Sequence, residues 1–480
     1  MLNRRDFLKA GTGLIASAFF PYNYAEAGQL IGRCDIENNY ELLINHIYSV
    51  IQKITDNDLE VAEDLRISQA NDFAVFCAER GFGRKAVEIL NDSIKLSQRL
   101  KPFRGYCTLI QSAEAYCYMD EYAQAFDALA EAWTILHIKN MTYTISYHGF
   151  WKYSTAKEKH IDVHYCRVQD KIQIARILIK RNKTDMALTL LDEAYNHSVD
   201  DRLFPIENSP IVHLTEAYCD IGLHNKAEEI AERIIPVMHI HDDYVVYSHS
   251  DKKRALAYIA GSYADIGRRD RAYKLLDKIS RLPKSKSREM ITAYAKLREW
   301  ETAMSLAEKE DPEFMFIHCS YIAIAKQAIL SGRKDISERA LDAAIKGIEK
   351  KDYSSELYAE LLREIADIFL SIGKNDKTAH LLNKAIGNLT EKKNVYLPYH
   401  DGFLADIGIS WIKAGDNNRG MKLLHAAFED IVALEDAFQK SEALSRIAKA
   451  YIDNNIAIKE KEREILKRVV DSCKEENHAI

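Results

Sequence analysis

Apolar residues recur along almost the whole chain at spacings of three and four residues, which is the period of an amphipathic α-helix. The recurrence is organised in a unit with a small residue, an apolar or aromatic residue three positions later, a turn residue four positions further on, and a second small residue after five more. In one copy these positions are Ala260, Tyr263, Gly267 and Ala272. Each unit therefore predicts a hairpin of two helices joined by a tight turn.

Ten copies of this unit follow one another towards the C-terminus. Their turn residues are Gly81, Asp120, Asn182, Gly222, Gly267, Arg298, Gly332, Gly373, Gly415 and Asn455. All except Arg298 are glycine, asparagine or aspartate, which tolerate the positive φ that commonly ends a helix. Because a single hairpin buries only part of its apolar surface, the copies must stack on one another.

This pattern resembles the tetratricopeptide repeat, and the resemblance covers the chain from about Leu65 to the C-terminus. It implies an all-α fold: an α-solenoid of stacked antiparallel helix hairpins wound into a right-handed superhelix. Successive turns depart from the family's 34-residue repeat, with a spacing of 31 residues between Gly267 and Arg298 and spacings of 41 and 42 further along. We therefore expect divergent repeats with extended helices or loops. The pattern leaves open whether the solenoid closes into a ring.

The N-terminus carries a separate signal. Residues 4–9 (RRDFLK) precede a short apolar run at 10–20 and the small-x-small sequence AEA at 25–27. Together they resemble the twin-arginine export signal, with Asn3 where Ser or Thr is usual. The resemblance implies that a bacterial twin-arginine translocase exports the folded protein, which would then be periplasmic or secreted.

These observations predict three parts of the chain. They are a twin-arginine signal peptide at 1–27, an N-terminal capping helix within 28–60, and a tetratricopeptide-like repeat array at 61–480. Two successive turns lie 62 residues apart, so the array is expected to contain a long inter-repeat insertion at about 138–168.

Charge and cysteine content narrow the function classes. The formal net charge is −6, and removal of residues 1–27 takes away three basic and two acidic side chains, which leaves −7. An acidic chain whose basic residues are scattered offers no continuous positive surface for nucleic acid. The mature chain contains no second long apolar run that would predict a membrane span. The eight cysteines are irregularly spaced without a CxxC, which favours buried free thiols over a disulfide framework.

The resemblance also suggests where a partner would bind, because the first helix of each tetratricopeptide hairpin lines a concave groove. The expected groove-facing residues are Glu114, Tyr118, Arg176, Lys180, Glu216, Asp220, Asp265 and Lys296. The Asn and Lys clamp of chaperone-binding family members is absent. A peptide partner is therefore expected, without that specificity.

Aromatic and histidine residues gather at three inter-repeat junctions. The long insertion contains Tyr147, His148 and Trp151, and two later junctions place tyrosines shortly before His249 and His400. These side chains either form loop surfaces that bind a ligand or are buried tyrosines that keep longer hairpins in register. The second interpretation is the simpler one, although the long insertion is the better candidate for function.

No sequence motif supports catalysis. GxSxG, HExxH, CxxCH and a glycine-rich phosphate loop are all missing, so no catalytic residue, metal site or cofactor is predicted. The favoured function is an exported, non-enzymatic scaffold that binds a protein or peptide partner through its groove and loops. The alternatives are a polysaccharide lyase or hydrolase built as an α/α toroid, and an accessory factor co-exported with a redox enzyme.

Overall fold

The computed structural model describes residues 33–54, 59–97, 102–138, 142–143, 159–160, 163–200, 210–233, 237–241, 244–248, 250–282, 288–309, 317–350, 353–391, 400–434 and 436–473. The predicted signal peptide at 1–27 lies outside these residues, as does most of the predicted insertion. The division of the chain into signal, capping helix and array therefore stays a prediction.

Ten helix hairpins follow one another along the chain. They are α3 (Leu59–Glu79) with α4 (Gly83–Ser97), α5 (Pro102–Tyr118) with α6 (Tyr122–Ile138), α7 (Val163–Lys180) with α8 (Thr184–Asp200), α9 (Pro210–Asp220) with α10 (His224–Glu232), α11 (Ser250–Asp265) with α12 (Arg269–Ser280), α13 (Arg288–Lys296) with α14 (Trp300–Glu308), α15 (Ile317–Leu330) with α16 (Lys334–Glu349), α17 (Ser355–Ser371) with α18 (Asn375–Glu391), α19 (His400–Lys413) with α20 (Asn417–Ala433), and α21 (Ala437–Asp453) with α22 (Glu460–Asp471). The predicted α-solenoid of stacked antiparallel hairpins is thus confirmed.

The turns between the paired helices lie where the sequence predicts them. Each of the ten predicted turn residues has a positive φ, including Arg298 at 64° and Gly222 at 81°. After the turn, the next amide reaches back to the first helix, as in the 2.8 Å hydrogen bond from Leu223 N to Tyr218 O. This bond satisfies a carbonyl at the helix end and fixes the reversal of the chain.

Small residues hold the two helices of a hairpin close together. Ala260 and Ala272 are completely buried where α11 meets α12. In the α19–α20 hairpin a Cβ added to Gly420 would lie 2.5 Å from the carbonyl oxygen of Gly408. A larger residue at that site would force the helices apart.

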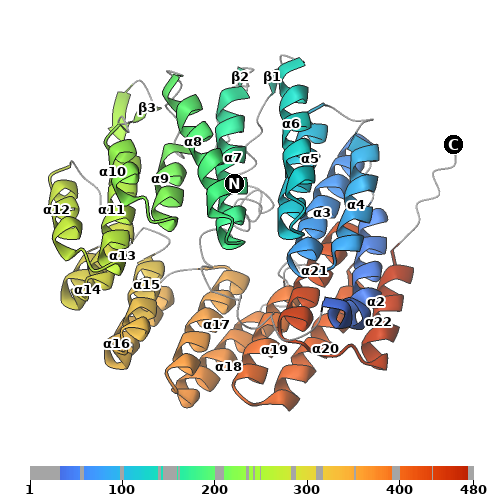
Figure 1. The fold of residues 1–480 in the computed structure, drawn as a ribbon. Coiled ribbons are helices and arrows are strands. Elements are labelled where there is room, and N and C mark those ends of the chain that lie inside the picture. Colours follow the sequence, from blue (N-terminus) through green and yellow to red (C-terminus); the bar gives the residue numbers. More distant parts are fainter. Residues whose placement is uncertain are drawn as a thin grey trace.

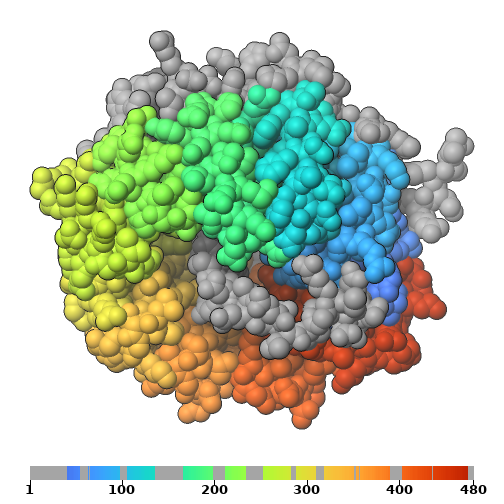
Figure 2. Space-filling view, in the orientation of Figure 1, coloured from blue at the N-terminus to red at the C-terminus, as the bar shows by residue number. Residues whose placement is uncertain are grey.

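The hairpins form a ring rather than an open array. In the lower arc of Figure 1, α15, α17 and α21 lie towards the inside of the ring and α16, α18 and α22 towards the outside. Figure 2 shows the hollow that the ring encloses. The sequence pattern could not decide between an open and a closed solenoid, because closure depends on the summed rotation of all the repeats.

Helix α2 (Arg33–Gln52) closes the ring by packing against α3 on one side and against α21 and α22 on the other. Tyr40 is 2 % exposed and donates to the carbonyl oxygen of Tyr451 at 3.3 Å. Lys53 Nζ donates to the carbonyl oxygen of Val470 at 3.1 Å. The helix that the sequence predicts as a cap thus joins the two ends of the array.

Apolar burial supports this closure. One hydrophobic core runs from Tyr40 through α3 and α4 and continues through α13–α22 to Cys473, so both ends of the chain share it. A second core fills the arc from Tyr106 to Leu297. Burial of apolar surface contributes about 25 cal/mol per Å², so the shared core is the main force that keeps the ring closed.

Two short antiparallel strand pairs interrupt the helical pattern at junctions where the sequence predicts loops. They are β1 (Thr142–Tyr143) with β2 (Lys159–His160), and β3 (Val237–His241) with β4 (Tyr244–Ser248). Valine, isoleucine and tyrosine are frequent in β3 and β4, and such residues favour extended backbone.

The side chains of seven of the eight cysteines are described, and all seven are free thiols. Cys77, Cys117 and Cys219 are at most 4 % exposed, which confirms their prediction as small buried apolar residues. Within the described part of the chain, every helix is too short or too polar to cross a bilayer.

Candidate functional site

The inner side of the ring is lined by the first helices of the hairpins. Polar side chains link successive inner helices from α3 to α13, and α15 to α17. The most connected of these residues is Glu216, which lies in the middle of α9 and is 5 % exposed. Helix α9 begins at Pro210, where a proline costs no backbone hydrogen bond, and ends before the turn at Gly222. These two boundaries place Glu216 between α7 and α11.

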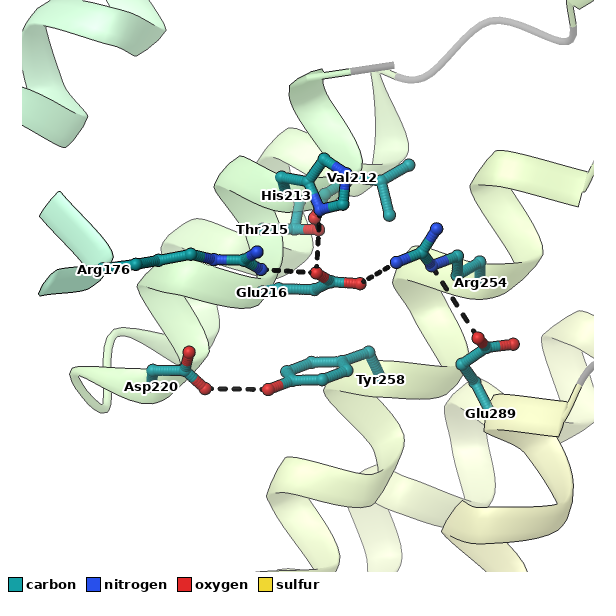
Figure 3. Close-up of polar contacts among 9 residues, drawn as sticks. All are labelled: Arg176, Val212, His213, Thr215, Glu216, Asp220, Arg254, Tyr258 and Glu289. Atoms are coloured by element: carbon teal, nitrogen blue, oxygen red, sulfur yellow. Dashed lines mark hydrogen bonds and ion pairs between the residues drawn. The ribbon is translucent and has the colours of Figure 1, made fainter. Parts of the chain in front are cut away.

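Glu216 accepts hydrogen bonds from three cationic or imidazole groups (Figure 3). Arg176 Nη2 from α7 lies 2.6 Å from Oε2, and Arg254 Nη2 from α11 lies 3.0 Å from Oε1. His213, one turn earlier on α9, contacts Oε2 at 3.1 Å. Arg254 Nε also lies 3.7 Å from Glu289 on α13, so one ion-pair network spans four inner helices.

The charges of this network decide the protonation of Glu216. Burial alone would raise the pKa of this carboxyl group, but the hydrogen bond from His213 and the charges of Arg254 and Arg176 outweigh it and lower the pKa to about 2. Glu216 is therefore ionised at neutral pH, and its charge is held by two arginines.

Further contacts continue the network towards the turn end of the inner helices. Asp220 on α9 accepts from the hydroxyl of Tyr258 on α11 at 2.8 Å (Figure 3). Lys296 on α13 donates to Asp265 on α11 at 2.6 Å. Each contact joins neighbouring hairpins and fixes the position of its side chains.

A different set of contacts occupies the arc from α3 to α7. Asp72 on α3 accepts from the amide of Gln111 on α5 at 2.7 Å, and Glu114 on α5 accepts from the amide of Gln173 on α7. Burial, followed by repulsion from Asp72 and Asp170, raises the pKa of Glu114 to about 8. Asp72 is exposed, yet the surrounding protein partly desolvates its carboxylate and raises its pKa to about 6. Neutral amides thus replace the arginines in this arc.

Five of the groove residues predicted from the sequence take part in contacts between inner helices of neighbouring hairpins in the arc from α7 to α13. They are Arg176, Glu216, Asp220, Asp265 and Lys296. Glu114 takes part in the α3–α7 arc, and Tyr118 packs partly buried against both hydrophobic cores. Lys180 is exposed at the end of α7.

The loop candidates cannot be placed in this site. Tyr147, His148, Trp151 and His249 lie outside the described residues, and His400 begins α19 with a side chain that is also outside them. A ligand surface made of these side chains stays a prediction.

Sequence reasoning missed several residues of the inner side. Asp72, Gln111, Gln173, His213 and Tyr258 each lie nine positions before the turn of their own hairpin. The same register reaches Glu364 on α17, which accepts from Lys326 on α15 at 2.8 Å. A search at this fixed distance from each turn could have found them. Arg254 lies one helical turn before that position on α11, so the search would not have found it.

The charged residues of α17 form a separate cluster. Arg363 donates to Glu360, three residues earlier, at 2.6 Å and to Asp367, four residues later, at 2.8 Å, so the three side chains share one face of the helix. The described residues hold no group of three or more His, Cys, Asp or Glu side chains arranged to bind a metal ion. The contacts described above for the inner side are hydrogen bonds and ion pairs.

No protein-family model and no curated protein matches the sequence. Solved structures with a similar arrangement include yeast Tom70, which is 13 % identical over 92 % of this chain and 95 % of that one, with a TM-score of 0.30. A tetratricopeptide repeat protein from Parabacteroides merdae is 12 % identical over 64 % of this chain and 99 % of that one, with a TM-score of 0.24. A circular tandem repeat protein is 13 % identical over 92 % of each chain, with a TM-score of 0.21. Similarity this low says nothing about function, and the fold class rests on the ten hairpins themselves.

Proposed function

We propose that this chain is an exported, non-enzymatic helical-repeat scaffold that holds a protein or peptide partner inside its ring. The observation that supports this function is the series of paired polar side chains on the inner helices from α3 to α13. Contacts between neighbouring hairpins hold many of these side chains in place before any partner arrives. A preformed surface lowers the ordering cost of binding.

The closed ring restricts the kind of partner. A segment that reaches the inner side must enter through an opening of the ring, so the partner contributes an extended segment or a chain end. Main-chain amide and carbonyl groups of such a segment can pair with exposed inner side chains such as Asp72 and Asp265. Contacts at the rim, including the predicted Tyr and His loops, would add specificity.

Export through the twin-arginine route is part of the proposal. Helix α2 begins at Arg33, shortly after the predicted cleavage site at residues 25–27, and packs against the last hairpin. The ring can therefore close only after the whole chain has been synthesised. A route that carries folded proteins suits such a fold, and cell fractionation of wild type and of an Arg4→Lys, Arg5→Lys variant would test it.

Crosslinking and pulldown from the periplasm test the scaffold function. The wild-type chain should capture a reproducible partner, and Arg176→Glu with Arg254→Glu should lose it, because both substitutions place negative charge beside Glu216. The control is Arg339→Glu, whose ion pair with Glu301 lies on the outer helices α16 and α14. Circular dichroism would verify that all variants remain folded. Undiminished capture by the inner variant, or no reproducible partner, contradicts the proposal.

One observation favours a second candidate, a polysaccharide lyase or hydrolase. Two carboxyl groups with raised pKa values, Asp72 and Glu114, lie on neighbouring inner helices of a closed ring, and shifted carboxyl pKa values are common at catalytic sites. An assay for reducing ends or unsaturated sugars with a polysaccharide panel tests it. Activity that Glu114→Gln abolishes would establish the enzyme, and identification of a redox enzyme in the pulldown would instead support the accessory factor.

A further inference from the structure

A cavity of about 380 Å³ lies where the ring-closing helix α2 meets the first hairpin. Its walls come from the end of α2, the first half of α3 and the end of α4. Sites that bind small organic molecules begin at about 300 Å³, so this cavity is large enough for a short aliphatic ligand. It lies outside the contact network of Glu216 described above.

Each of the three helices contributes an apolar side chain to the wall. They are Ile51 from α2, Ala70 from α3 and Leu96 from α4. Ile51 and Ala70 are 1 % and 7 % exposed, so both belong to the core and present a fixed surface. An aliphatic chain of a ligand would exchange contact with water for contact with these groups.

A buried hydroxyl group in the same cavity lacks a hydrogen-bond partner. Ser93 on α4 is 1 % exposed, and its Oγ makes no hydrogen bond within the described part of the chain. A buried polar atom without a hydrogen-bond partner destabilises the folded chain. An oxygen atom of a bound ligand would remove this penalty.

The charged groups of the wall favour an anion. Among the described residues, the guanidinium of Arg66 makes one hydrogen bond, from Nε to the carbonyl oxygen of Ile54, and no ion pair. Lys95 lies 3.6 Å from Asp92, whose other oxygen accepts from the Tyr48 hydroxyl at 2.8 Å. Two cations and one carboxylate give this wall a net charge of +1.

We propose that this cavity binds a small amphipathic carboxylate. The carboxylate would accept from the terminal nitrogens of Arg66 and from the Ser93 hydroxyl, while the apolar chain lies against Ile51, Ala70 and Leu96. A charge-assisted pair of this kind is stronger than a neutral hydrogen bond. Because the ligand would touch α2, α3 and α4 together, its binding stabilises the closed ring, which is a role beyond holding a partner in the lumen.

Isothermal titration calorimetry with the full chain tests the ligand class. The probes are octanoate, N-acetylleucine and the neutral octanamide, each at up to millimolar concentration. At least one carboxylate should bind, and octanamide should bind about tenfold more weakly or less, a difference of about 1.4 kcal/mol. Stronger binding of octanoate indicates an acyl ligand, and stronger binding of N-acetylleucine indicates an amino-acid derivative. Absence of binding by both carboxylates, or equal binding of octanamide, overturns the proposal.

Variants test the position of the ligand. Arg66→Gln should weaken carboxylate binding about tenfold, and Ala70→Phe should abolish it by filling the cavity. Ser93→Ala should weaken binding less and leave the fold intact, since it removes an unpaired hydroxyl; Arg339→Gln on the outer helices is the matched control. Bound ligand should also slow amide hydrogen exchange in α2. Unchanged affinity in both Arg66→Gln and Ala70→Phe, or unchanged exchange in α2, contradicts the assignment.

Discussion

Two arcs of the inner side shift the pKa of a glutamate at the same repeat position in opposite directions. In the α7–α11 arc, Glu216 is held by two arginines and a histidine, and its pKa falls to about 2. In the α3–α7 arc, Glu114 is held by a glutamine amide and faces other carboxylates, and its pKa rises to about 8. Both residues lie six positions before the turn of their hairpin. The backbone of the repeat thus sets the position of a side chain, and the neighbouring hairpin sets its charge.

The largest expected effect comes from removing the charge at the centre of the α7–α11 arc. Glu216→Gln leaves Arg176 and Arg254 without their shared carboxylate and should lower the free energy of unfolding by about 2–3 kcal/mol at pH 7. Urea denaturation monitored by circular dichroism measures this loss. The control is Glu301→Gln on the outer helix α14, whose ion pair with Arg339 is exposed to solvent and should contribute much less to stability than the pairs of Glu216. Equal losses in the two variants would contradict the central role of Glu216.

The pH dependence of stability distinguishes the two arcs. The pKa of Glu216 is depressed in the folded chain, so its contribution is present above about pH 4.5 and is lost as the pH falls towards 2. The pKa of Glu114 is raised, so its contribution falls as the pH increases from about 4.5 to about 8. Glu114→Gln should therefore stabilise the ring by about 1 kcal/mol at pH 8 and above. Thermal melts from about pH 2 to pH 9 cover both windows. An unchanged slope in Glu114→Gln between pH 5 and pH 8 would contradict the assignment.

The smallest expected effect comes from a substitution that gives the α3–α7 arc a cation, as in the α7–α11 arc. Gln173→Arg places a cation beside Glu114, which should lower the pKa of Glu114 and raise the stability at pH 8 by about 0.5 kcal/mol. Gln173→Glu is the matched control and should have the opposite effect through like-charge repulsion. The same series of thermal melts measures both variants, and shifts of equal sign would show that charge is not the cause.

The local parts of the fold could be predicted from the sequence. Each turn is determined by a few neighbouring residues. Even Arg298 was identified, through Tyr294 and Ala303, although Ile291 stands where most copies have a small residue. Ring closure could not be predicted, because the hydrogen bond from Tyr40 to Tyr451 joins residues 411 positions apart. It depends on small rotations accumulated over ten hairpins.

For the candidate site, the sequence likewise predicts the positions within each repeat but not the contacts between repeats. Arg176, Glu216 and Asp220 lie on the inner helices because their positions are fixed relative to each turn, whereas their role in binding stays a prediction. Arg254 was missed because it lies outside those positions, and the neutral environment of Glu114 depends on which residue the next hairpin supplies. Which side chains pair between neighbouring hairpins depends on how the hairpins pack in three dimensions. The sequence of a single repeat therefore cannot predict these pairs.

Closure by α2 also changes how the chain should come apart. An open solenoid frays from its terminal repeats, and its stability is close to a sum over neighbouring pairs. Here each hairpin has a neighbour on both sides, since α2 fills the junction between α3 and α21. Loss of any single hairpin must break two interfaces at once. The ring should therefore unfold with greater cooperativity than a linear array of the same ten hairpins, with no end from which melting can begin.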